Sequence, residues 1–141
     1  MGSRTDSSLL FRVLDANVNR ASEGLRVCEE VARMVLDDAV LTRRIQQIRH
    51  GLVQAAAKAG KKPALISARD SRTDVGRPAL RGGNSRHRGY RDLVLANARR
   101  AEEALRVLEE FSRLTSVSAG AAFSRLRFQV YSVEQELLNR L

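Results

Sequence analysis

The chain has 141 residues and a formal net charge of +9, with 25 lysines and arginines against 16 aspartates and glutamates. This length suffices for one hydrophobic core, and no apolar run reaches the roughly 18 residues that a membrane-spanning helix needs. One cysteine and two histidines cannot furnish a Cys/His metal site or an internal disulfide. Because no charged-then-apolar leader precedes the first helix either, we expect a cytoplasmic protein.

The first half of the chain carries the pattern of two amphipathic helices. Apolar residues recur at spacings of three and four over residues 9–36, which predicts a long helix with one buried face. Asp37 and Asp38 then mark a tight turn and the cap of a second helix, predicted over residues 39–59. A Gly-Lys-Lys-Pro sequence ends that helix, because glycine just past the last turn and proline beyond it are the usual stop.

The segment over about residues 60–90 connects the two halves and carries most of the net charge. Between residues 60 and 91, nine lysines and arginines stand against two aspartates, a net charge of +7 that leaves +2 for the rest of the chain. Residues 64–67 are predicted to form a short extended segment. A connector of this length is usually either functional or disordered, and we expect chemistry in it.

The second half of the chain repeats the first. Helices are predicted at about residues 90–114 and 121–141, separated by a Ser/Gly turn. Sliding the sequence by 80 residues aligns residues 16–33 with residues 96–113, and 11 of these 18 positions are identical. Several of the identical residues are polar or charged, which a shared amphipathic pattern alone does not explain. The chain is therefore interpreted as a duplicated helical unit.

These features predict an all-α fold. Two helical hairpins, over about residues 9–59 and 91–141, would form a four-helix bundle joined by the long basic connector. We expect residues 1–141 to make up a single helical domain. The buried faces of the two repeats should share one core that contains Leu25, Cys28, Leu105 and Leu108.

Each repeat places an asparagine inside its apolar stripe and an arginine at the edge of that stripe. These residues are Asn17 and Arg20 in the first copy, and Asn97 and Arg100 in the second. A buried amide that lacks a partner costs about 1–3 kcal/mol, so the asparagines need a reason. One alternative is that they fix the register of the packed helices. The other is that asparagine and arginine face a polar ligand in the bundle.

The connector segment RDSRTDVG, from Arg69 to Gly76, alternates aspartate, arginine and threonine before a glycine. Such a segment can offer guanidinium and backbone N–H groups to phosphate, and carboxylates to magnesium. Arginine outnumbers lysine 22 to 3 in the chain. This favours bidentate binding of phosphate or carboxylate over a diffuse cationic surface.

Three motifs in order along the chain resemble a known family. They are RVLDANVNRASEGLRVCEEVAR at residues 12–33, RDSRTDVG at residues 69–76 and DLVLANARRAEEALRVLEEF at residues 92–111. The chain is similar, over almost its full length, to the small helical domain often fused ahead of thiamin-phosphate synthase. That domain is described as a hydroxymethylpyrimidine phosphate kinase unrelated to the ribokinase-like enzyme. No barrel follows Leu141, so we do not expect the synthase activity in this chain.

The resemblance implies a phosphotransferase of thiamin biosynthesis. It would use ATP and Mg²⁺ to convert 4-amino-5-hydroxymethyl-2-methylpyrimidine phosphate to the pyrophosphate. Its expected partners are these small molecules, with a functional link to thiamin-phosphate synthase and no membrane. Whether the chain forms a homo-oligomer is left open by the sequence.

On this interpretation the chemistry is assembled in the connector. Arg72, Asp74 and Asp70 would be catalytic, with both aspartates binding magnesium. Asn17 and Asn97 would bind the pyrimidine substrate. The nucleotide and the phosphates would be bound by Arg69, Thr73, Gly76, Arg20, Arg100 and Arg86.

Three other classes of function compete with this one. A nucleic-acid-binding module would use the basic connector to contact phosphates, but the helices lack a basic face and the chain has few aromatic residues for base stacking. The second alternative is another ATP-binding helical bundle. The RTD-x-G segment of this chain is similar to a segment of corrinoid adenosyltransferase-like enzymes, which are bundles of this kind. A purely structural bundle would leave the asparagine pair and the connector without a role.

Overall fold

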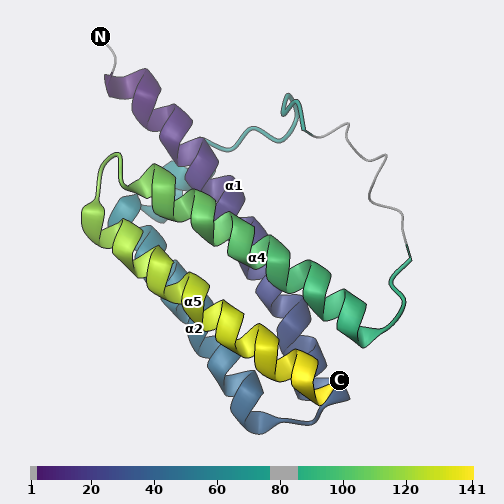
Figure 1. Cartoon of the computed structure of the whole chain (residues 1–141). Helices are drawn as coiled ribbons and strands as arrows, with labels where there is room; N and C mark the ends of the chain where they lie inside the picture. Colours follow the sequence, from purple (N-terminus) through teal and green to yellow (C-terminus); the bar gives the residue numbers. More distant parts are fainter. Residues whose placement is uncertain (1–2, 77–85) are drawn as a thin grey trace.

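The computed structural model describes residues 3–76 and 86–141, with side chains from residue 7 onward. Over these residues the fold is all-α, as predicted, and no strand is present among them (Figure 1). None of the described helices is both long and apolar enough to cross a bilayer. The elements in chain order are α1 (Ser3–Glu30), the π-helical turn η1 (Val31–Val35), α2 (Ala39–Ala59), α3 (Lys62–Ser67), α4 (Tyr90–Ser112) and α5 (Val117–Arg140).

The four long helices each pack against two others. Helix α1 packs against α2 and α4, and α5 packs against the same two helices. Packed neighbours run in opposite directions, so that α1 and α5 share one direction and α2 and α4 share the other (Figure 1). The two repeat helices, α1 and α4, are therefore direct antiparallel neighbours. A pseudo-twofold axis between them relates the two halves of the molecule.

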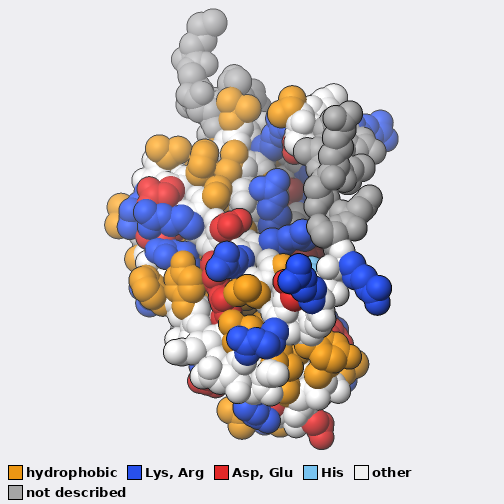
Figure 2. All heavy atoms as spheres, turned by 45° about the vertical axis from the view of Figure 1, so that its right-hand side comes forward, with side chains coloured by type: hydrophobic (Ala, Val, Ile, Leu, Met, Phe, Trp, Pro, Cys, Tyr) orange, Lys and Arg blue, Asp and Glu red, His pale blue; other side chains and the backbone are white. Residues whose placement is uncertain are grey.

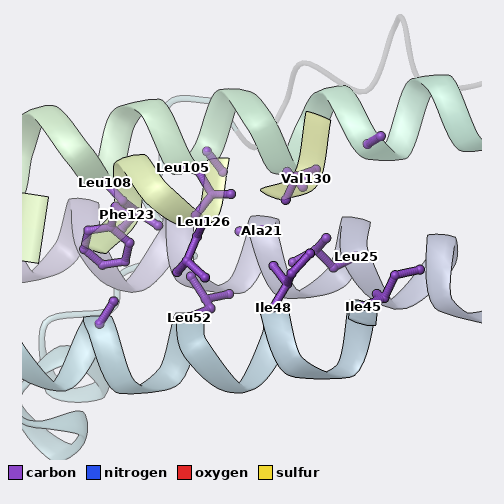
Figure 3. Packing of buried hydrophobic residues seen from close by; sticks show 14 of the residues in the cluster. Ala21, Leu25, Ile45, Ile48, Leu52, Leu105, Leu108, Phe123, Leu126 and Val130 are labelled. Carbon is purple, nitrogen blue, oxygen red and sulfur yellow. The ribbon is translucent and has the colours of Figure 1, made fainter. Parts of the chain in front are cut away.

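One hydrophobic core runs through the bundle and takes side chains from all four long helices. Figure 3 shows Leu25 of α1 beside Ile45 and Ile48 of α2, while Leu105 and Leu108 of α4 lie near Phe123 of α5. The prediction that the stripes of both repeats share one core is confirmed, since the four residues named for it are all buried in this cluster: Leu25, Cys28, Leu105 and Leu108.

Each hairpin contains a buried glutamate held by an arginine of its second helix. Glu29 of α1 is 1% exposed, and Arg49 of α2 donates to it at 2.9 Å. At the equivalent position of α4, Glu109 is 3% exposed and accepts a hydrogen bond from Arg127 of α5 at 3.0 Å. Burial disfavours the charged form of Glu109, but the hydrogen bond and charge of Arg127 and the neighbouring arginines outweigh it and lower the pKa of this carboxyl.

In the first hairpin, helix α2 begins at the residue that the sequence predicted. Asp38 caps α2, because its carboxylate accepts the backbone N–H of Leu41 at 2.9 Å. The first helix is longer than predicted at its start, from Ser3. It ends through η1, in which the N–H of Leu36 donates to the carbonyl of Val31 five residues back.

The prediction of an extended segment at residues 64–67 is wrong, because these residues lie in the short helix α3. Pro63 occupies the first turn of α3, where the missing N–H of proline costs nothing. Leu65 is buried in the core. A run of three apolar residues fits a strand and a helical turn equally well, so periodicity could not separate them.

Helix α5 begins at Val117, four residues before the predicted start. Ser116 caps it, and the side-chain oxygen accepts the N–H of Ala119 at 3.2 Å. Gly120 was interpreted as part of a turn but lies inside the helix. A Cβ at this position would come within 2.7 Å of Cγ of Arg113, so tight packing explains this glycine.

Helices α1 and α4 lie in close contact at Gly24. A Cβ added there would lie 2.5 Å from the backbone carbonyl oxygen of Asn97 and 3.5 Å from Cβ of Ala101. The contact is with backbone, which cannot rotate away as a flexible side chain can. Gly24 therefore sets the distance between the two repeat helices.

Replacing Gly24 with alanine should destabilise the fold by about 1–3 kcal/mol, because the methyl group forces α1 and α4 apart. The change works against helix propensity, by which alanine is favoured over glycine by about 1 kcal/mol. Denaturant unfolding of the Gly24→Ala variant measures the difference. The control is Gly51→Ala in α2, where the new Cβ would meet only the end of the Leu126 side chain, at 2.9 Å. A Gly24→Ala variant more stable than the original protein would show that the close approach does not set the helix spacing.

Candidate functional site

The candidate site is a cleft of about 630 Å³ between the two repeat helices. Five of its lining residues come from α1 and five from α4, and every residue pairs with the one 80 positions away. The cleft therefore lies on the pseudo-twofold axis and is built twice from the same motif. The pairs are Asn17 with Asn97, Arg20 with Arg100, Glu23 with Glu103, Gly24 with Ala104, and Val27 with Val107.

The two asparagines are bonded within their own helices. Nδ2 of Asn17 donates to the carbonyl of Val13, and Nδ2 of Asn97 donates to the carbonyl of Leu93, both at 2.9 Å. Among the described residues, neither amide donates to the opposite helix, so the asparagines do not set the register through direct hydrogen bonds across the interface. Asn17 also accepts a hydrogen bond from Arg20 at 3.4 Å. Both side chains line the cleft, as the ligand alternative requires.

The walls of the cleft carry charges of both signs. Arg20, Arg100, Glu23 and Glu103 are all exposed along it. Lysine and arginine side chains also gather on the face of the molecule shown in Figure 2, beside fewer acidic ones. The glutamates were not predicted as site residues. They could have been found in the sequence, because they are identical in both repeats and lie one helical turn after the arginines.

An ion pair fixes the beginning of the connector on α1. The carboxylate of Asp15, which is 6% exposed, accepts two hydrogen bonds from Arg69 at 2.7 and 2.8 Å. Nη2 of Arg12 also donates to the backbone carbonyl of Asp70 at 3.4 Å. This pair uses the N–H of Nε and one N–H of Nη2 of Arg69, so the remaining N–H groups, on Nη1 and Nη2, are those left for the predicted phosphate contact. Asp15 was not predicted, because its partner lies 54 residues away.

Within the connector, the two aspartates have different surroundings. Both carboxylate oxygens of Asp70 accept hydrogen bonds from Thr73, one from its hydroxyl and one from its backbone N–H. These bonds lower the pKa of Asp70, helped by the charge of Arg12. Among the described residues, Asp74 accepts the N–H of Gly76 at 2.8 Å, through one oxygen. Asp74 also lines a cleft.

That second cleft, of about 530 Å³, joins the connector to the repeat helices. It is lined by Ser71, Arg72, Asp74 and Gly76 of the connector, and by Arg20 of α1. Since Arg20 also lines the first cleft, the two clefts meet at this side chain. Seven predicted residues therefore line this pair of adjoining clefts: Asn17, Arg20, Arg72, Asp74, Gly76, Asn97 and Arg100. The other four predicted residues are not among the residues that line these two clefts: Arg69, Asp70, Thr73 and Arg86.

The clefts offer oxygen ligands of the kind that magnesium prefers. Among the described residues, no group of three or more His, Cys, Asp and Glu side chains converges on one point. Magnesium in phosphoryl-transfer sites commonly needs only one or two carboxylates, with substrate phosphates and water completing its shell. Asp74 of the second cleft, or Glu23 or Glu103 of the first, would supply one or two such carboxylates, which fits the ion.

A third cleft, between α4 and α5, holds a pair of glutamates. Glu102 is 7% exposed, one of its oxygens is buried without a described hydrogen-bond partner, and Glu134 lines the same cleft. Burial, followed by the hydrogen bond and charge of Glu134, raises the pKa of Glu102 to about 8. At neutral pH Glu102 is therefore largely a neutral acid. The first repeat has Ser22 at the equivalent position, so this pair is not duplicated.

The raised pKa of Glu102 predicts a loss of stability in alkali. Its folded-state pKa exceeds the unfolded value, so the stabilisation is complete below about pH 4.5 and is lost as the pH rises through about 8. Glutamine resembles the neutral acid. The free energy of unfolding of Glu102→Gln, relative to that of the original protein, should therefore rise by more than about 1 kcal/mol from pH 5 to pH 9. Unfolding at both pH values measures this. Glu103→Gln is the control, because Glu103 is exposed; an equal change in both variants would contradict the assignment.

The pair formed by Asp15 and Arg69 predicts that the connector can be released selectively. Asp15→Asn keeps the shape but removes the charge, and losing a charge-assisted bidentate pair costs about 1.5–3 kcal/mol. Trypsin should therefore cleave after Arg72 at least about tenfold faster in this variant, while the helices remain folded. Asp37→Asn, at the exposed turn before α2, is the control. Unchanged cleavage after Arg72 would show that the pair does not hold the connector.

Comparison with known proteins gives long, continuous matches. The chain is 40% identical over 129 residues to a protein of Synechocystis sp. (strain ATCC 27184 / PCC 6803 / Kazusa) named thiamine-phosphate synthase, a match covering 92% of this chain and 36% of that protein. A protein of the same name from Rhodopirellula baltica is 35% identical over 135 residues, covering 96% of this chain and 36% of the relative. A third, from Nostoc punctiforme, is 36% identical over 130 residues, a match covering 92% of this chain and 36% of that protein.

The chain thus spans only 36% of the length of these curated relatives. No solved structure matches it. The relatives agree with the resemblance that the three motifs indicate, a helical segment found within longer thiamine-phosphate synthases. A model of the ThiD2 family matches residues 12–136, which include both repeats and the connector, and the chain therefore belongs to the ThiD2 family.

Proposed function

We propose that the chain is an enzyme of thiamin biosynthesis that transfers a phosphoryl group from ATP to 4-amino-5-hydroxymethyl-2-methylpyrimidine phosphate. Its family and the name of its relatives support the pathway. The observation that carries the reaction type is the meeting of two clefts at Arg20. One contains the paired Arg20 and Arg100, and the other contains Arg72 and Asp74 of the connector.

Phosphoryl transfer depends mostly on positioning and on stabilising negative charge. The phosphates of donor and acceptor repel each other, and cations must offset that repulsion as they approach. Arg20, Arg72 and Arg100 are exposed along the two clefts and would do this. Guanidinium groups suit the role, since each can donate two parallel hydrogen bonds to phosphate oxygens.

The acceptor in this reaction is itself a phosphate. Its second pKa is about 6, so at neutral pH it already carries an anionic oxygen. No strong general base is therefore required, in agreement with a site built of arginine, asparagine and carboxylate. Magnesium, when bound, would neutralise part of the charge of the transferred group, with Asp74, which lines the same cleft as Arg72, as a ligand.

The relatives suggest how the product would be used. In each, the segment matching this chain is part of a longer protein named thiamine-phosphate synthase. We propose a functional link between this chain and a synthase that consumes the pyrimidine pyrophosphate. A second chain or a further domain would supply that activity.

The proposal is tested with ATP, magnesium and the pyrimidine phosphate, by following release of ADP and formation of the pyrophosphate by phosphorus NMR. Asp74→Asn should lower kcat/KM at least about tenfold, a loss of about 1.4 kcal/mol of transition-state stabilisation. Arg72→Lys should also lower it, because an ammonium cannot reproduce bidentate geometry.

The control for both variants is Arg43→Lys, an exposed arginine of α2 that lines none of the clefts described above. Its kcat/KM should stay within about twofold of the original value. No pyrophosphate from the original protein would refute the proposed reaction. Full activity in Asp74→Asn and Arg72→Lys would move the active site away from the connector.

A further inference from the structure

The cleft on the pseudo-twofold axis contains two equivalent sets of ligand-binding groups. Asn17, Arg20 and Glu23 approach it from α1, and the residues 80 positions later approach it from α4. Because α1 and α4 are antiparallel, the two sets face the axis from opposite directions. We call them the α1 half-site and the α4 half-site. Each contains one guanidinium group and one side-chain amide, which together suit a phosphate group.

The connector makes the two half-sites unequal. Beside the α1 half-site, Arg20 borders the cleft that also contains Arg72 and Asp74. This arrangement follows from the Asp15–Arg69 pair, which holds the connector against α1. Position 95 of α4, which corresponds to Asp15, is a leucine and cannot make such a pair. The α4 half-site therefore lacks the anchor that brings the connector to α1.

The difference in charge and length matches the difference between the two substrates of the proposed reaction. The chain of three phosphates in a nucleoside triphosphate is longer and more negative than a monophosphate, and it binds magnesium. The α1 half-site and its adjoining cleft together offer Arg20, Arg72 and the carboxylate of Asp74. Among the described residues, the α4 half-site offers one arginine, Arg100, which suits one phosphate group.

We propose that the α1 half-site binds the triphosphate of the nucleotide and the α4 half-site binds the phosphate of the pyrimidine acceptor. This inference rests on the proposed function and assigns its two substrates to the two copies of the repeat. The transferred group then crosses the pseudo-twofold axis. An oxygen of the acceptor phosphate forms a bond to the γ-phosphorus as the bond between that phosphorus and the β–γ bridging oxygen breaks, and the electron pair leaves on ADP.

Arginine-to-alanine variants at the two equivalent positions test this assignment. The probes are the non-hydrolysable β,γ-imido analogue of ATP with magnesium, and the pyrimidine phosphate, each titrated alone by calorimetry. Arg20→Ala should weaken binding of the analogue at least about tenfold, the loss expected for a charge-assisted hydrogen bond. It should leave the affinity for the pyrimidine phosphate within about threefold of the original value. Arg100→Ala should show the opposite pattern.

Lysine at each position supplies the conservative control, and should restore part of the affinity for the same ligand only. Both arginines are exposed, so thermal unfolding of the variants should match that of the original protein. The assignment would be overturned if both alanine variants weakened binding of the same ligand equally. It would also be overturned if Arg20→Ala weakened binding of the pyrimidine phosphate and Arg100→Ala that of the analogue.

Failure of the assignment is distinguishable from failure of the proposed function. Turnover with the original protein, combined with variants that weaken the same substrate, would refute the half-sites and leave the kinase activity standing. Selective binding without any pyrophosphate formed would refute the kinase activity and leave the half-sites standing. An original protein that binds neither probe would overturn both.

Discussion

The close antiparallel contact between α1 and α4 is the constraint on which the rest of the structure depends. At Gly24 the backbone of one repeat helix lies against the backbone carbonyl of Asn97 in the other. Helices held this closely cannot bury long side chains at the crossing, and small residues fill it: Ala21 and Ala101 are both fully buried. The polar residues one turn away are then presented to the same cleft from both helices. The helix spacing thus creates the site as well as part of the core.

The identities between the two repeats separate into two physical roles. Leu25 and Leu105 fill the core, while Glu29 and Glu109 are buried ions paired with arginines of the following helix. Removing one partner of such a pair is costly, which explains why the charged residue is retained in both copies. Asparagine, arginine, glutamate and valine pairs line the cleft instead. Core packing and ion pairing therefore account for some members of the duplicated motif, while other members line the cleft.

The connector converts this symmetric arrangement into an unequal one. Asp15 is buried and charged, and the bidentate contact with Arg69 satisfies it while fixing the connector beside Arg20. The local hydrogen bonds of Asp70 with Thr73 and of Asp74 with Gly76 shape the segment that follows. The internal duplication places similar residues on both sides of the cleft, and the connector, held by Asp15 and Arg69, lies beside Arg20 of α1. The proposed reaction, whose two substrates differ, would use this inequality.

The sequence by itself determined the four long helices and the cap at Asp38, because each depends on local periodicity or on side chains a few residues apart. It also showed the duplication directly, as identities between residues 80 positions apart. The shared core was a prediction from the two apolar stripes, which the structure confirmed. The sequence also singled out Asn17 and Asn97 as polar residues inside an apolar stripe, with Arg20 and Arg100 at the edge of that stripe. Only the tertiary structure decided that α1 lies against α4, that Glu23 and Glu103 join the cleft, and that Asp15 binds Arg69. A periodic pattern specifies which face of a helix is buried but carries no information about which helix covers it. Contacts between residues 54 or 80 positions apart arise only when the whole chain packs.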